Sequence, residues 1–279
     1  MGIYPFISNN GYYKTITSET HLMYTHIASL TRGISLIRPL HSRLVWVILL
    51  LLFFRGAMAE MPKLTLNAGT AEPFINADGS GFYGELVEEV FKRIGIEAKV
   101  IRLPSGRSII NANEGIDDGV IARTQGMDEQ YKNIIRVPVP VVQFKFVAYS
   151  IDKKLQVKGW DSFEPYSVGY IRGWRIYEVN VKKYKSLTVV NNAEQLFRLL
   201  MNGRTDLILF EYYRGTWWNE HLNANAHLIG SPVAQKPMFM YMHKKHKDLV
   251  PKITAAIEAV KADGTYDKIA DRTLPAYMK

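Results

Sequence analysis

The sequence has no cysteine among its 279 residues. This absence excludes a disulfide framework, a thiolate metal site, a cysteine nucleophile and a lipid-modified cysteine. Catalytic and metal motifs are absent as well, since there is no HExxH, GxSxG, P-loop or GxGxxG pattern. We therefore expect a protein that is neither an enzyme nor a lipoprotein, and that binds no cofactor and no metal.

No hydrophobic run is long enough to cross a bilayer as a helix, which takes about 20 residues. The longest, residues 44–54, follows three arginines and precedes Ala57 and Ala59. A basic segment, a short apolar segment and a small-residue site are typical of a secretory signal. We expect residues 1–59 to be a leader cleaved after Ala59; an uncleaved anchor is the alternative, and Met23 is an alternative start.

The excess of positive charge is mild, with 35 Lys and Arg against 26 Asp and Glu and a formal charge of +9. The leader carries five basic residues and one acidic residue, so the charge falls to +5 on the remaining body. The densest basic stretch, residues 243–247, is typical of a solvated loop before a helix rather than of a nucleic-acid-binding surface. We expect no nucleic-acid partner.

From residue 60 onward, β-type runs alternate with helical patterns, which predicts an α/β fold with mainly parallel sheets. The first unit has expected strands at 63–67, 99–103 and 119–123 and expected helices at 85–94 and 105–113. The same order restarts after Asp161, with expected strands at 167–171, 187–190 and 206–210 and an expected helix at 192–201.

Two such units predict two lobes. We expect residues 60–149 to be the first part of lobe 1, 150–234 to be lobe 2, and 235–279 to return to lobe 1. Extended stretches at 141–149 and 237–242 lie between the units, and an amphipathic helix is expected at 249–263. If that helix packs on the first lobe, the chain crosses twice between the lobes, which makes a hinge with a ligand cleft beside it.

Several ordered segments resemble the bacterial extracellular solute-binding proteins of family 3, over nearly all of residues 62–275. They include GTAEPF at 69–74, GFYGEL at 81–86, VGYIRG at 168–173, GRTD at 203–206 and DGTY at 263–266. The resemblance implies a periplasmic-binding-protein-like fold, two lobes that close on a small-molecule solute, and delivery to an ABC permease by a periplasmic monomer.

By position, the resemblance implies ligand-binding residues in the turn of the second lobe, Gly173 and Trp174, and after the strand at 206–210, Glu211 with Tyr212. In amino-acid receptors of this kind that carboxylate meets the ammonium group of the ligand. The sequence departs from the family pattern where Gln130 replaces the arginine that clamps the ligand carboxylate. The resemblance therefore implies a polar, anionic or zwitterionic, amino-acid-like solute, and leaves its pose open.

Arg123 is the candidate for the missing clamp, and Arg107 is a second candidate for binding an anion. Arg123 ends the strand at 119–123, and strand ends in this architecture face the ligand. Its planar fork matches a carboxylate, although an ion pair with Asp117 or Asp118 is the structural alternative. Arg107 lies in the first turn of a helix, where an anion is favoured; its alternative is a solvated surface residue.

The remaining candidates each have a structural alternative. Phe74 is expected against the ligand, although phenylalanine is commonly part of a core. Trp174 is suited to stacking on a ligand, and equally to packing between lobes. Glu211 is expected at the cleft rim, with a surface charge as the alternative.

The function expected from the sequence is capture of a solute for an ABC importer. One alternative is a sensory module that presents its ligand to a chemoreceptor or sensor kinase. Another is an enzyme resembling cyclohexadienyl dehydratase on the same fold, with Glu211 beside an arginine as its acid.

Overall fold

The computed structural model describes residues 62–275, which belong to one compact unit. The leader expected at residues 1–59 lies outside the described residues. The strands form an eight-stranded sheet in the order β2-β1-β3-β8-β4-β7-β5-β6. They are β1 (Lys63–Ala68), β2 (Glu97–Arg102), β3 (Gly119–Arg123), β4 (Ile134–Ser150), β5 (Ser167–Ile171), β6 (Ser186–Val190), β7 (Leu207–Glu211) and β8 (His227–His243).

Each end of the sheet is a set of parallel strands. At one end β1 pairs in parallel with β2 and β3, and at the other β5 pairs in parallel with β6 and β7. Between them, β8 is antiparallel to β3, β4 is antiparallel to β7, and β4 and β8 are antiparallel to each other. The expectation of mainly parallel sheets therefore holds within each lobe, and the strands that join the lobes are antiparallel.

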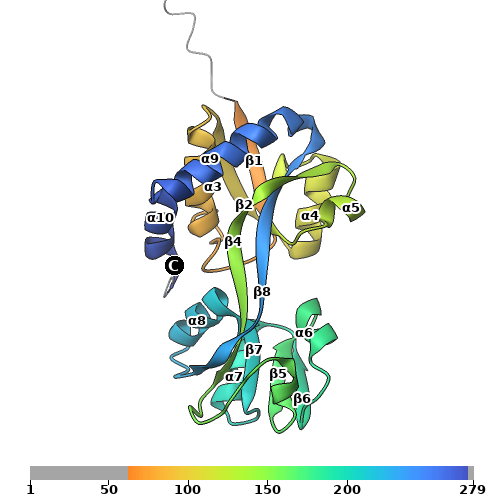
Figure 1. The fold of residues 1–279 in the computed structure, drawn as a ribbon, viewed down its shortest axis with the longest axis vertical. Coiled ribbons are helices and arrows are strands. Elements are labelled where there is room, and N and C mark those ends of the chain that lie inside the picture. The colour runs from red at the N-terminus through yellow and green to blue at the C-terminus, as the bar shows by residue number, and fades with distance from the viewer. Residues whose placement is uncertain (1–61, 276–279) are drawn as a thin grey trace, which may run out of the picture. The chain divides into compact units, whose positions relative to one another are not determined.

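Two long strands connect the lobes. The stretches expected at 141–149 and 237–242 are parts of β4 and β8, each of which has 17 residues. Figure 1 shows β4 and β8 running side by side from the part that holds β1 to β3 into the part that holds β5 to β7. The predicted fold class, two α/β lobes joined by two crossings of the chain, is confirmed.

Helices cover both lobes. In the first lobe they are α3 (Phe82–Lys92), α4 (Ser105–Glu114), α5 (Met127–Gln130), α9 (Val250–Ala262) and α10 (Thr265–Thr273). In the second lobe they are α6 (Arg175–Asn180), α7 (Ala193–Met201) and α8 (Tyr212–His221). The short 3-10 helices are η1 (Trp160–Phe163) and η2 (Lys244–Leu249). The loop expected at 243–247 is thus mostly the helical turn η2.

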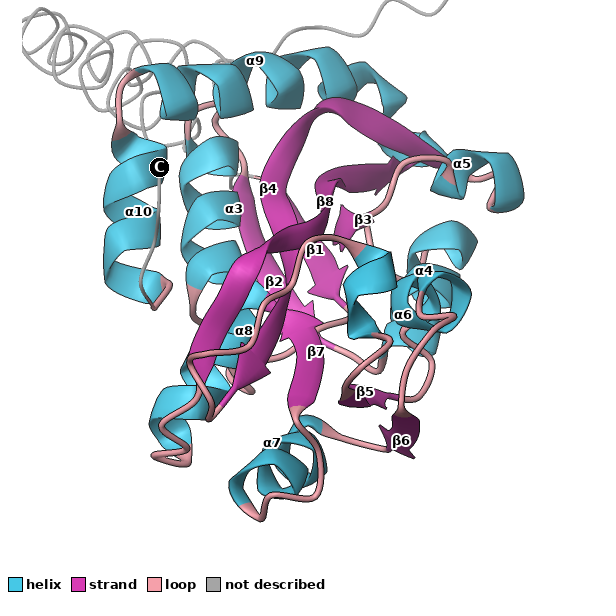
Figure 2. Ribbon diagram, turned by 60° about the horizontal axis from the view of Figure 1, so that its bottom comes forward, coloured by secondary structure: helices cyan, strands magenta, loops and turns pink. Residues whose placement is uncertain are grey.

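Apolar spacing explains why the predicted helices form. In α3, Leu86, Val87, Val90 and Phe91 are fully buried, as their spacing on one face predicts. Helix α7 begins at Asn192, whose side chain accepts a hydrogen bond from the backbone N–H of Gln195, as expected for an N-cap. Helices α3, α9 and α10 pack against one another on one side of the first lobe (Figure 2). No helix between residues 62 and 275 is long and apolar enough to cross a bilayer.

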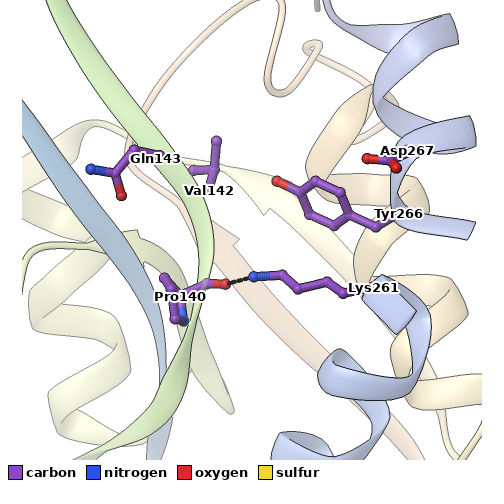
Figure 3. Close-up of a pocket in the computed structure, with 6 residues that line it drawn as sticks. All are labelled: Pro140, Val142, Gln143, Lys261, Tyr266 and Asp267. Carbon is purple, nitrogen blue, oxygen red and sulfur yellow. Dashed lines mark hydrogen bonds between the residues drawn. The ribbon is translucent and has the colours of Figure 1, made fainter. Parts of the chain in front are cut away.

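The joining strand β4 is irregular where it passes the first lobe. Its pairing with β8 shifts register between Arg136, Pro140 and Val142. The side chains of α9 and α10 satisfy two carbonyls there: the Lys261 Nζ donates to the Pro140 carbonyl at 2.5 Å, and the Tyr266 hydroxyl donates to Val141 at 2.9 Å. Figure 3 shows Lys261 and Tyr266 facing β4 across a cavity of about 320 Å³. These contacts tie the joining strand to the first lobe.

Candidate functional site

A buried polar cluster fixes the start of α4 beside the end of β1. The Asn67 side chain donates to the Ser108 carbonyl at 3.0 Å and to the Asp117 carboxylate at 2.7 Å, and the Ser108 hydroxyl donates to Asn67. All three residues are buried. Because these bonds join α4 to β1, the first turn of α4 lies at the carboxyl edge of the parallel strands, where ligands bind in open α/β sheets.

An irregularity at the end of β3 positions Arg123 at the same edge. Ala122 has a φ of +62°, a left-handed conformation that is uncommon for a residue with a Cβ. The pairing of β3 with β8 shifts register between Val120 and Arg123. Bulges of this kind re-aim a side chain next to a functional site.

The Arg123 guanidinium rests against the start of α4. Its Nη1 donates to the Ser105 hydroxyl at 3.0 Å and its Nη2 to the Ser105 carbonyl at 2.7 Å. Gly69 leaves room for this group, because a Cβ at Gly69 would overlap Nη2. The Arg123 Nε is buried without a hydrogen-bond partner, and burial lowers the pKa of Arg123. The alternative of an ion pair with Asp117 or Asp118 is wrong.

Both aspartates are engaged elsewhere. Asp117 accepts from Asn67 and Asn111, while Asp118 pairs with Lys245 at 2.8 Å. Neither is therefore available to neutralise Arg123.

The second lobe contributes the turn between β5 and α6. Gly173 has a φ of +81°, which favours glycine, and its backbone N–H donates to the Glu178 carboxylate at 2.8 Å. Trp174 stacks on Tyr177 with ring centroids 5.8 Å apart and packs against Phe210 at 4.9 Å. Because the Gly173 N–H is already hydrogen-bonded to Glu178, the turn contributes side chains to the cleft.

Arg214, in the first turn of α8, was not among the residues expected from the sequence. Its guanidinium carbon lies 5.5 Å from the centroid of the Trp174 ring and 5.1 Å from that of Phe210. Its Nε is buried without a partner, and the guanidinium forms no hydrogen bond or ion pair with any residue between 62 and 275. Burial lowers the pKa of Arg214, but an arginine stays charged at neutral pH.

Both lobes and both joining strands line one cleft of about 680 Å³. Its apolar walls are Ala122, Phe144, Phe146, Trp174, Ile176, Val179 and Met238. Its polar lining comprises Thr70, Ser105, Thr124 and Asn180. Arg214 also lines an adjoining cavity of about 490 Å³ that shares Gly69, Thr70 and Ser105 with the cleft. The combined space suits a small molecule.

The charge of the cleft has one sign. Five cationic side chains line it, and no carboxylate does; the five are Arg123, Arg172, Arg175, Arg214 and Lys236. None of the five pairs with a carboxylate of the described chain. Chemically, the arrangement can bind an anion through charge-assisted hydrogen bonds while holding an apolar body between aromatic walls.

The structure brings together three of the residues expected from the sequence, Arg123, Gly173 and Trp174. Four others lie outside the lining of the cleft: Phe74, Arg107, Glu211 and Tyr212. Their ligand-binding roles stay predictions.

Two of these four, Phe74 and Tyr212, are held by other contacts, and a third, Arg107, is exposed. Phe74 is fully buried and stacks on Tyr83 and Phe144, each with ring centroids 5.1 Å apart. Tyr212 is buried, and its carbonyl accepts from the Tyr149 hydroxyl at 2.8 Å. Arg107 is exposed on α4. Phe74 therefore supports the wall residue Phe144 from behind.

Glu211 is fully buried and caps α8. Its carboxylate accepts the backbone N–H groups of Tyr213 at 3.3 Å and Arg214 at 3.0 Å. Burial raises the pKa of Glu211 to about 7, although these hydrogen bonds favour the charged form. The carboxylate thus holds the first turn of α8, and with it Arg214, beside the cleft.

No group of three or more potential metal ligands gathers within residues 62–275.

Two α/β lobes joined by two long strands, with a cleft between the lobes, define a two-lobed binding-protein fold. The chain belongs to the bacterial extracellular solute-binding proteins, family 3, which its sequence matches over residues 67–275.

Solved structures with this fold include transport and sensor proteins. An ancestral arginine-binding protein bound to arginine is 20% identical, with a TM-score of 0.58 over 76% of this chain and 97% of that one. A histidine kinase sensor domain with similarity to periplasmic binding proteins is 13% identical, with a TM-score of 0.61 over 76% and 96% of the two chains. The GluR0 ligand-binding core with L-glutamate is 14% identical, with a TM-score of 0.65 over 78% and 100%. The comparison with curated proteins gave no match.

Proposed function

We propose that this protein is an exported, periplasmic receptor that captures a small anionic solute in the cleft between its lobes and delivers it to an ABC importer. The observation that carries the proposal is the unpaired guanidinium of Arg214 in a cleft lined by five cations and no carboxylate. Arg214 is half-buried with its Nε out of contact with water, and a bound anion would supply the partner that the described chain does not. The apolar run and basic residues within 1–59 support export.

A sensory role is the second candidate, because a histidine kinase sensor domain has the same fold. The two roles use the same cleft and differ in the partner. Uptake of a radiolabelled ligand in a strain that lacks the gene separates them. Lost uptake indicates an importer, whereas normal uptake with a lost transcriptional or chemotactic response indicates a sensor.

The enzyme alternative has less support. The family consists of binding proteins, and Glu211, its candidate acid, is absent from the lining of the cleft and caps α8.

A thermal-shift screen of residues 60–279 against amino acids, organic acids and small peptides tests the proposal. A solute at about 100 times its Kd should stabilise the protein by about 2.7 kcal/mol. Arg214→Gln should weaken binding of that solute by at least about tenfold, since it removes a charged hydrogen-bond donor. The matched control is Arg198→Gln, which removes an equal charge from an exposed pair with Glu194 on the same lobe. No shift with any compound, or equal affinities for the two variants, contradicts the proposal.

A further inference from the structure

Four of the seven arginines that lie outside the cleft in residues 62–275 pair with a carboxylate, whereas no cation of the cleft does. Arg93, Arg102, Arg198 and Arg272 each pair with a carboxylate within 2.8 Å. The five cations of the cleft have no carboxylate partner in the described chain. Arg172, Arg175 and Lys236 are exposed to solvent, whereas Arg123 and Arg214 are half-buried, so a ligand with a single negative charge leaves one of these two arginines without an anionic partner.

The lining of the cleft also contains no carboxylate to pair with a cationic group on the ligand. The nearby carboxylates of Glu211 and Glu178 accept backbone N–H groups and do not line the cleft. An ammonium group placed there meets five like charges and no carboxylate among the residues that line the cleft. A zwitterionic amino acid thus lacks the counter-charge that its amino group requires.

The cations approach from both lobes. Arg123 belongs to the end of β3 and is backed by the first turn of α4, whereas Arg214 belongs to α8 and is backed by Trp174. Between these positions, the joining strands contribute Phe144, Phe146 and Met238. This arrangement places anion-binding groups on each lobe and an apolar floor between them.

We infer that the solute is an organic acid with at least two anionic groups, an apolar body and no ammonium group. This inference rests on the proposed function and narrows the class of its ligand. The anionic groups bind the arginines of the two lobes, and the apolar body lies on the aromatic floor.

Three acids that differ at a single carbon test the inference by calorimetric titration. The three compounds share a benzyl group and one carboxylate, and they differ in one substituent on the carbon between these groups. That substituent is hydrogen in 3-phenylpropanoate, ammonium in phenylalanine and a second carboxylate in benzylmalonate. Glutarate, glutamate and propane-1,1,3-tricarboxylate form the aliphatic equivalent. We expect the acid with the added carboxylate to bind at least about tenfold more tightly than the parent acid, and the amino acid to bind most weakly.

Variants show whether this order comes from the cleft. In Arg214→Gln, the advantage of benzylmalonate over 3-phenylpropanoate should fall below about threefold, while Arg198→Gln should retain it. If either amino acid binds more tightly than its parent acid, the inference is wrong and the proposed receptor function stands. If none of the six compounds binds at about 10 mM, the inference is also wrong, and the receptor function is decided by its wider screen.

Discussion

At the scale of single residues, Arg214 is the side chain whose placement demands an explanation. Its guanidinium packs on Trp174 and Phe210 and donates to no described residue. Such cation–π contacts contribute about 0.5–2 kcal/mol, and they leave the buried Nε of this half-buried side chain without an acceptor. Perturbed charges of this kind gather at functional sites. A bound anion would give the guanidinium the acceptor that it lacks.

Sequence reasoning could not single out Arg214. The α8 sequence has no apolar stripe, and nothing in it distinguishes a cleft arginine from a surface one. The available signal was position: Arg214 lies in the first helical turn after the carboxyl end of β7. Arg123 was predictable because it ends its strand, a position with a known relation to the cleft.

Glu211 makes a prediction about pH. The pKa of its buried carboxyl, about 7, exceeds the ordinary value of 4.5, so the folded protein binds more protons than the unfolded chain between these values. Its contribution to stability is therefore complete below about pH 4.5 and is lost as the pH rises through about 7. In Glu211→Gln, the free energy of unfolding relative to the parent protein should rise by about 3 kcal/mol between pH 4.5 and pH 8.

Urea unfolding curves at a series of pH values measure this difference. Glu194→Gln, at an exposed carboxylate of the same lobe, is the control. Parallel pH profiles for the parent and Glu211→Gln would show that the raised pKa is wrong.

At the scale of elements, the regular parts of the fold could be predicted and the irregular parts could not. Strands β3 and β5 match their expected limits, because short apolar runs bounded by turns that contain glycine or proline specify them. Helix α10 was missed since it is mostly polar, with Ile269 and Ala270 as its buried residues. It forms through packing on α3 and α9, which a local pattern does not reveal.

The contact between Arg123, Gly69 and α4 makes a prediction about the site. In Gly69→Ala, the added Cβ would overlap the Arg123 guanidinium and lie 2.8 Å from the Ser105 Cα. We expect a loss of about 1–3 kcal/mol in the free energy of unfolding, as for overpacking elsewhere, and weaker binding of anionic solutes.

The matched control is Gly106→Ala, one residue into α4, where an added Cβ meets nothing within 4 Å. It should stabilise the protein by up to about 1 kcal/mol through helix propensity and leave affinity unchanged. Thermal unfolding and titration of both variants check this pair. Equal effects of the two alanines would contradict the account of Gly69.

At the scale of the whole described molecule, the two long strands decide the architecture. β4 and β8 each run through both lobes and carry Phe144, Phe146, Lys236 and Met238 to the cleft. The sequence predicted two crossings of the chain, but it showed only the C-terminal part of each strand, residues 141–149 and 237–242. The N-terminal parts are specified by pairing with distant strands, which a local pattern does not show.

On the proposed function, Arg214 holds the anionic group of the solute in this cleft. A crystal structure of the protein with benzylmalonate, or with the acid that stabilises it most, tests this role of Arg214. We predict a carboxylate oxygen within about 3 Å of the Arg214 guanidinium. An acid bound elsewhere, such as in the cavity beside Lys261, or bound in the cleft without a hydrogen bond from Arg214, would show that Arg214 does not hold the solute.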